Sequence, residues 1–184
     1  MKELTDYSGP FLPYLRLEDF SKETLISLIK LYSKLYMALD GFWYLSIKER
    51  LGNDEALKCD EWVWEKEHRF ELKHLAQLFR IEGDGIAPFL TAFQLIPWAW
   101  NLDFSFDVQK PTCALFTVNR CPTLEALEKE GGGREHSICR VIEPKVFQSY
   151  AKFFNPKIQV TALKLPPRKD EREVPCQWKV TMTE

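Results

Sequence analysis

The most constraining feature of the chain is a long stretch, residues 21–81, in which apolar side chains recur every three or four positions. This spacing is typical of one face of an amphipathic helix. Gly52 interrupts the stretch as a natural helix-ending residue, and Asn53 or Asp54 is suited to cap a second helix. We therefore expect two long helices in an antiparallel hairpin. The expected buried face of the first helix comprises Leu25, Leu28, Ile29, Tyr32, Tyr36, Leu39, Trp43 and Ile47.

After a shorter third helix, closed by Pro97, the periodicity changes to the alternation of strands. Four strands are expected, at residues 102–108, 112–119, 157–165 and 176–182, with helices near 124–127 and at 144–154 between the second and third. The sequence thus predicts an α+β fold: an N-terminal long helical hairpin followed by a β-β-α-α-β-β unit with a mainly antiparallel four-stranded sheet.

The length of 184 residues fits a single domain spanning 1–184. Within it we expect an irregular arm (1–20), a helical part (21–97) and an α/β part (98–184) that carries the cysteine motifs.

The charge balance and the cysteine count exclude several classes of protein. Lys and Arg number 25 against 27 Asp and Glu, a net charge of −2, which offers no electrostatic footprint for nucleic acid or an anionic membrane. The N-terminus lacks the apolar core of a signal peptide, and no apolar run approaches a membrane span. Five cysteines cannot form a complete disulfide framework. These features predict a cytoplasmic protein with reduced thiols.

Three cysteines lie where the expected secondary structure breaks: Cys121 after the second strand, Cys139 before the last helix and Cys176 at the start of the fourth strand. Thiolates are soft ligands, and His136 lies three residues before Cys139, so these four residues are candidate zinc ligands. The alternative is that the cysteines are small buried apolar residues at the ends of the sheet, since no C-x-x-C pair is present.

A second group of candidates shares one face of the second helix: Trp64, His68 and Glu71. If this face borders a cavity, Glu71 would orient His68 as a general base, with Cys139 as a candidate nucleophile. The alternative is a core histidine with satisfied hydrogen bonds.

Asp40, Gly41 and Trp43 form a third feature within the first helix. Glycine weakens a helix interior, so Gly41 is expected to permit the close approach of a neighbouring group. Asp40 is then a candidate ligand contact at the margin of the apolar face. A pocket between hairpin and sheet would be lined by Asp40, Trp43, Trp64, His68 and Glu71.

Several short motifs carry a resemblance to a known family. They are Asp40-Gly41-Phe42-Trp43, the stretch 62–71, Ile96-Pro97-Trp98-Ala99, Arg120-Cys121-Pro122, Ile138-Cys139, residues 156–160, Pro166-Pro167 and Cys176-Gln177-Trp178. From about residue 25 onward the chain resembles an uncharacterised family (a domain of unknown function) of small cytosolic proteins found mainly in anaerobic prokaryotes. Its second half also resembles the L-2-amino-thiazoline-4-carboxylic acid hydrolase-like group and, more distantly, 4-vinyl reductase-type domains.

The resemblance implies an α/β module that houses a small organic ligand, in some relatives beside a cysteine-bound zinc. Cys121, Cys139 and Cys176 match recurring family cysteines, whereas Leu165 stands where the family often has another. The fourth position would then be His136, Glu143 or open. Our first hypothesis is a small-molecule-binding protein with a cysteine-ligated zinc. The alternatives are a hydrolase acting on a cyclic C–N or C–S bond, with His68 or His136 as base, and a structural protein that forms a homodimer.

Overall fold

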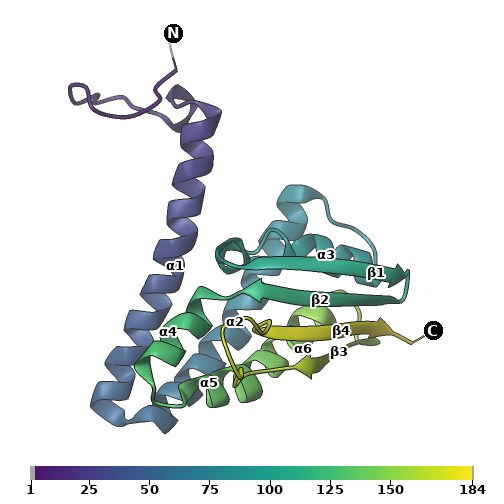
Figure 1. The fold of residues 1–184 in the computed structure, drawn as a ribbon. Coiled ribbons are helices and arrows are strands. Elements are labelled where there is room, and N and C mark those ends of the chain that lie inside the picture. The colour runs from purple at the N-terminus through teal and green to yellow at the C-terminus, as the bar shows by residue number, and fades with distance from the viewer. Residues whose placement is uncertain (1–2, 184) are drawn as a thin grey trace.

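A computed structural model describes residues 3–183 and has the predicted mixture of helices followed by an antiparallel sheet (Figure 1). The N-terminal helices are α1 (Lys22–Leu51), α2 (Asn53–Phe79) and α3 (Ile86–Phe93). The hydroxyl oxygen of Ser21 accepts the N–H of Thr24 and caps α1. Gly52, at φ 91°, makes the turn into α2, a backbone conformation that only glycine adopts without strain.

The sheet has the strand order β1-β2-β4-β3, and every neighbouring pair is antiparallel. Its strands are β1 (Asp103–Lys110), β2 (Cys113–Arg120), β3 (Ile158–Lys164) and β4 (Cys176–Met182). The predicted four-stranded antiparallel sheet is therefore confirmed. Because β2 and β4 are neighbours, the end of β2 lies beside the beginning of β4, with Val118 opposite Cys176.

The connection between β2 and β3 is more helical than the sequence predicted. It contains α4 (Pro122–Glu130), α5 (Arg134–Ser137), a π-helical turn (Ile138–Ile142) and α6 (Glu143–Phe154). We expected no helix at 134–142, because the glycines at 131–133 predict a loop there. The π-helical turn joins α5 to α6 and carries Cys139.

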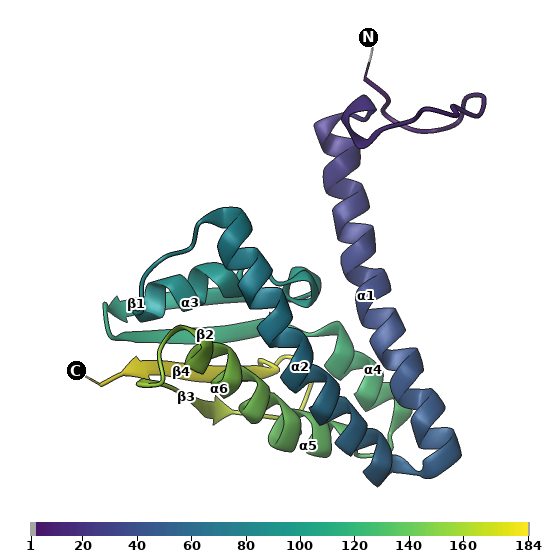
Figure 2. The same cartoon turned by 180° about the vertical axis from the view of Figure 1, so that it is seen from behind.

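Helices α2, α3 and α6 lie against the same face of the sheet and enclose the main core (Figure 2). Phe93 of α3 lies at its centre, with its ring 4.7 Å from that of Phe116 on β2 and 5.6 Å from that of Phe147 on α6. A short 3-10 helix (Pro97–Asn101) follows α3 and contributes Trp98, whose ring is 5.2 Å from that of Phe93. Such edge-on aromatic pairs stabilise the core beyond their burial.

Helix α1 differs most from expectation. The predicted buried face is wrong: of the thirty residues of α1, only Ser33 and Tyr44 are buried, while Tyr32, Leu39 and Trp43 are exposed. A helix of this length extends about 45 Å, and its N-terminal half stands clear of the sheet and its covering helices in both views (Figures 1 and 2). None of the helices within residues 3–183 is long and apolar enough to cross a membrane.

Candidate functional site

A pocket of about 770 Å³ lies between the helical hairpin and one end of the sheet. Helices α1 and α2 form one wall, and the ends of β2 and β4 with α4 and the π-helical turn form the other. Its surface is mainly apolar, and aromatic walls come from Tyr44, Trp64 and Trp98. Ligand pockets typically have volumes of about 300–1,000 Å³, so this space suits a small organic molecule.

The structure brings Cys121, Cys139 and Cys176 together at this pocket. Cys121 is the N-cap of α4, and its sulfur accepts the N–H of Leu124 at 3.4 Å. Cys139 enters from the π-helical turn and Cys176 from the first position of β4. His136 is exposed on α5 and does not line the pocket.

Burial keeps the pocket thiols protonated. It raises the pKa of Cys121 to about 11 and that of Cys176 to about 12. The pKa of Cys139 is also raised, first by burial and then by Glu143 and the other two thiols. Because the thiolate is the reactive form of cysteine, these groups are poor nucleophiles in this environment.

Four carboxyl groups line the pocket with the thiols, and one of them, Glu130, is paired with Lys48 and Arg134. The other three are Asp40 and Glu143, which the sequence analysis named, and Asp60, which it missed. Burial raises the pKa of Asp40 to about 6. Burial and then Asp40 raise the pKa of Asp60 to about 7, and burial followed by Asp60 and Asp40 raises that of Glu143 to about 7. Burial is the main cause in each case, and like-charge repulsion adds to it at Asp60 and Glu143.

Two of these carboxyl groups have local signals in the sequence. Asp60 lies four residues before Trp64, hence on the same face of α2, and Glu143 lies four residues after Cys139. Gly41 also lines the pocket, and a Cβ added there would meet no atom within 4 Å. The expectation that Gly41 admits a close neighbour is therefore wrong, because the space beside it is open.

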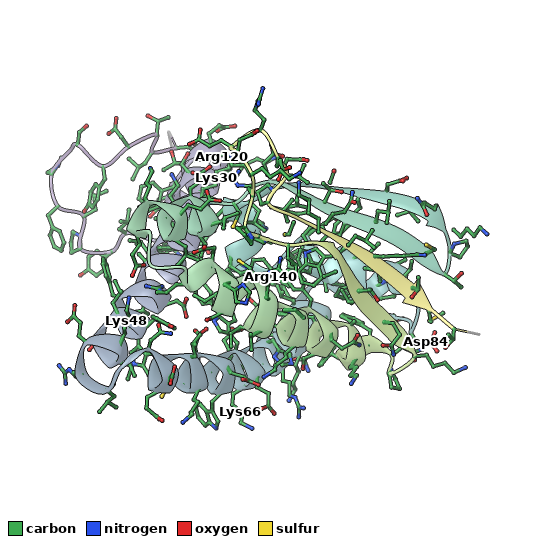
Figure 3. The ribbon with its side chains drawn as sticks, turned by 60° about the horizontal axis from the view of Figure 1, so that its bottom comes forward. Lys30, Lys48, Lys66, Asp84, Arg120 and Arg140 are labelled. Carbon is green, nitrogen blue, oxygen red and sulfur yellow. The ribbon has the colours of Figure 1, made fainter. Side chains whose placement is uncertain are left out.

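Charged side chains tie the elements around the pocket together. Lys48 of α1 contacts Glu130 of α4 at 2.6 Å, and Arg134 contacts the same carboxylate at 2.8 Å while its guanidinium lies 4.5 Å from the ring centre of Tyr44. Arg140 donates from Nε to the carbonyl oxygen of Pro166 at 2.7 Å, which joins the π-helical turn to the loop before β4. Figure 3 labels Lys48 and Arg140 on these elements.

Two of the five predicted pocket residues, Asp40 and Trp64, line the pocket, whereas Trp43, His68 and Glu71 do not. Trp43 is exposed on the outer side of α1. His68 and Glu71 share the face of Trp64 but lie about 6 Å and about 10 Å further along α2 at 1.5 Å per residue. At that height along the axis of α2, this face of the helix packs against α6 and no longer borders the pocket.

His68 is satisfied where it lies. Its Nδ1 donates to the carbonyl oxygen of Trp64, and its Nε2 accepts the hydroxyl of Ser149 on α6 at 2.7 Å. Burial lowers the pKa of His68, which favours this neutral form. This geometry fits a core histidine with satisfied hydrogen bonds better than it fits a general base at the pocket.

Glu71 lies in a neighbouring buried network. Its Oε2 accepts the hydroxyl of Tyr150 at 3.0 Å, and that hydroxyl oxygen accepts the indole N–H of Trp98 at 3.1 Å. Burial, followed by the nearby Glu67, raises the pKa of Glu71 to about 8. The carboxyl group therefore stays largely protonated at neutral pH and joins α2 to α6.

The predicted zinc ligands do not fit a zinc site in this structure. Within residues 3–183, no group of three or more His, Cys, Asp or Glu side chains is arranged to hold a metal ion. His136, the predicted fourth ligand, is exposed on α5 and does not line the pocket that the three cysteines share. The zinc site stays a prediction for metal analysis.

Comparison with known proteins shows which family the chain matches. A search of curated proteins and a search of solved structures each found no significant match. The expected likeness to the hydrolase-like and reductase-type groups and the expected anaerobic origin stay predictions. Residues 18–182, which include every helix and strand from α1 to β4, match one family model. The chain therefore belongs to a family of unknown function, DUF6125.

Proposed function

We propose that this protein binds a small organic molecule with an apolar body and a basic nitrogen in the pocket between the hairpin and the sheet. The observation that carries the proposal is the pocket itself: about 770 Å³, mainly apolar, with its polar groups few and convergent. This combination is typical of sites that bind small molecules.

The polar groups favour a positively charged ligand. Asp40, Asp60 and Glu143 all line the pocket, and its other two charged lining residues, Glu130 and Arg134, are paired with each other. A protonated amine placed among the three carboxyl groups would stabilise their ionised forms, whose formation burial and mutual repulsion oppose. The faces of Trp64 and Tyr44 offer further attraction to a cation.

The hydrolase alternative receives no support from this geometry. His68 and His136 both lie outside the pocket lining, so neither proposed base faces a ligand bound there. The Cys139 thiol has a raised pKa and no histidine beside it in the lining to take its proton. Binding without chemistry is the function that these residues support best.

A matched pair of probes tests the proposal. Tryptamine and indole-3-propionate have the same aromatic body, but one carries an ammonium group and the other a carboxylate. We expect tryptamine to raise the melting temperature of the wild-type protein, followed by circular dichroism, and to bind in isothermal titration calorimetry, while indole-3-propionate does neither. Equal binding of both probes would refute the role of the carboxyl groups, and binding of neither would refute the amine class.

A variant that fills the pocket locates the binding. Gly41→Leu places a side chain into open space and replaces glycine in the interior of α1, so the fold should be retained. Ala87→Leu on the exposed side of α3 adds an apolar side chain outside the pocket and is the control. Gly41→Leu should abolish the tryptamine response, and Ala87→Leu should keep it. Metal analysis of the same protein, purified without chelator, checks the zinc prediction: one zinc per chain, lost when Cys139 is replaced by Ser, would identify the thiols as ligands.

A further inference from the structure

Helix α1 carries an apolar stripe that faces away from the rest of the chain. The outer stripe consists of Leu28, Tyr32, Leu35, Leu39 and Phe42, at successive spacings of four, three, four and three residues. The exposed fractions of the last four are 58%, 52%, 69% and 71%. This alternation of three and four is the repeat by which helices pair side by side.

The inner face of α1 is already occupied by the chain itself. The Ser33 hydroxyl donates to the carbonyl oxygen of Pro97, and the Asn101 side chain donates to Ser33 Oγ at 2.6 Å. One turn on, the ring of Tyr36 packs edge-on against Trp64 of α2 at 6.2 Å. Leu35 lies two residues from Ser33, which turns it by about 200° around the helix. Helix α1 is therefore apolar on two opposite sides, a pattern typical of a helix covered from both.

The exposed apolar surface of α1 has the size of a protein interface. Ile29, Leu31 and Trp43 flank the outer stripe and are each between 43% and 49% exposed. With about 200 Å² for each large side chain, the stripe and its flanks expose about 700–800 Å². A stable protein–protein interface buries about 800 Å² on each partner. A contiguous apolar patch of this size marks an interaction site.

We propose that the outer stripe of α1 is the interface of a homodimer, in which α1 of one copy packs along α1 of a second copy. The same patch serves both partners across a two-fold axis, so the chain supplies its own complement with the same three–four repeat. Between residues 24 and 39 of α1, Lys30 and Lys34 are the only charged residues, so the stripe carries no acidic pattern that would select a basic partner. Figure 3 labels Lys30 on this segment.

The charge of the chain argues against a lipid surface as the occupant. Helices that lie on membranes combine an apolar face with a polar face rich in Lys and Arg. The opposite face of α1 instead packs on Pro97, Asn101 and Trp64, and the net charge of the chain is −2. A second copy therefore fits the patch better than an anionic bilayer does.

The oligomeric state of the full chain tests the proposal. Light scattering coupled to size-exclusion chromatography, at micromolar concentration, should give twice the chain mass of 21.6 kDa. Leu35→Glu and Leu39→Glu each place a carboxylate in the centre of the interface and should weaken the dimer at least about tenfold. Both side chains are more than half exposed in the single chain and neither lines the pocket, so the fold and the tryptamine response should be retained.

The matched control is Leu78→Glu, which changes the same residue type on the exposed side of α2, where Leu78 is 74% exposed. This variant should remain dimeric. A wild-type protein of single-chain mass, or a dimer that survives both stripe substitutions, would overturn the proposal. The proposal would also be overturned if the protein were a monomer that co-sediments with phosphatidylserine vesicles and if Leu39→Glu abolished this co-sedimentation. Because the tryptamine response is measured separately, failure of the dimer leaves the pocket proposal unaffected.

Discussion

Replacing Asp60 by Asn removes an ionisable group from the pocket while preserving the shape of the side chain. Asp60 is buried at the pocket wall, where burial and the neighbouring Asp40 raise its pKa from 3.8 to about 7. The indole of Trp64 and the charge of Arg134 oppose this shift, but they do not outweigh burial. The wild-type protein must therefore ionise a buried carboxyl group as the pH rises to 7, whereas Asp60→Asn does not.

The sign and the size of the effect follow from proton linkage. A carboxyl group whose pKa is raised by folding stabilises the folded state fully below its unfolded pKa, and this contribution is lost as the pH rises through the folded pKa. For Asp60 the window runs from about pH 4 to about pH 7. One pKa unit corresponds to about 1.4 kcal/mol, so the two units between about pH 5 and about pH 7 set an upper range near 3 kcal/mol. We expect Asp60→Asn to gain about 1–3 kcal/mol relative to wild type between these pH values.

Urea denaturation of both proteins, at about pH 5 and about pH 8, measures this change in the free energy of unfolding. Asp84→Asn is the control, because Asp84 is an exposed aspartate outside the pocket; the stability difference between this variant and wild type should be the same at both pH values. If Asp60→Asn also shows the same difference at both pH values, Asp60 is not a buried carboxyl group with a raised pKa. A loss relative to wild type on raising the pH would reverse the sign of the argument.

Three further outcomes follow from the packing. Phe93→Ala removes the ring at the centre of the aromatic core and should lower the free energy of unfolding by about 3–5 kcal/mol in urea titrations; a loss below about 1 kcal/mol would contradict its central role. Ser33→Ala removes the hydroxyl that joins α1 to the 3-10 helix at Pro97 and should cost about 1–2 kcal/mol in thermal melts, with the sheet unaffected in circular dichroism. In maleimide labelling followed by mass spectrometry, Cys59 should react faster than the three pocket thiols, and tryptamine should slow the pocket thiols alone; equal rates would show that the pocket is open.

The sequence predicted the convergence of the three cysteines because their positions are defined by the sheet. Cys121 follows β2 and Cys176 begins β4, and in an antiparallel pair these two ends meet. The prediction used only the break in secondary structure at each cysteine, and the strand order that makes β2 and β4 neighbours was not predicted. Cys139 joins them through the π-helical turn before α6, a local geometry for which residues 138–142 carry no distinct periodic signal.

The positions of His68 and Glu71 relative to the pocket were not predictable in the same way. Helical spacing establishes which residues share a face, and it placed both correctly on the face of Trp64. It does not establish which neighbour covers that face at each level along the helix axis. Asp60 and Trp64 meet the pocket, whereas His68, one turn beyond, meets Ser149 of α6. Only the packing of α6 across α2 decides where the pocket ends.

Helix α1 shows the same limit of an argument from helical spacing. Its apolar positions were interpreted from the sequence as one wide buried face. Apolar periodicity indicates that a helix face is buried, but it does not indicate whether the same chain or another chain buries it. The structure divides those positions between two opposite sides, so that Tyr36 packs on Trp64 while Tyr32 and Leu39 remain exposed. The side that the chain covers forms a wall of the pocket at Met37 and Tyr44. No residue of the outer stripe lines the pocket, so the two sides of this one helix have separate roles: one side forms a wall of the pocket, and the other is the proposed contact with a second copy.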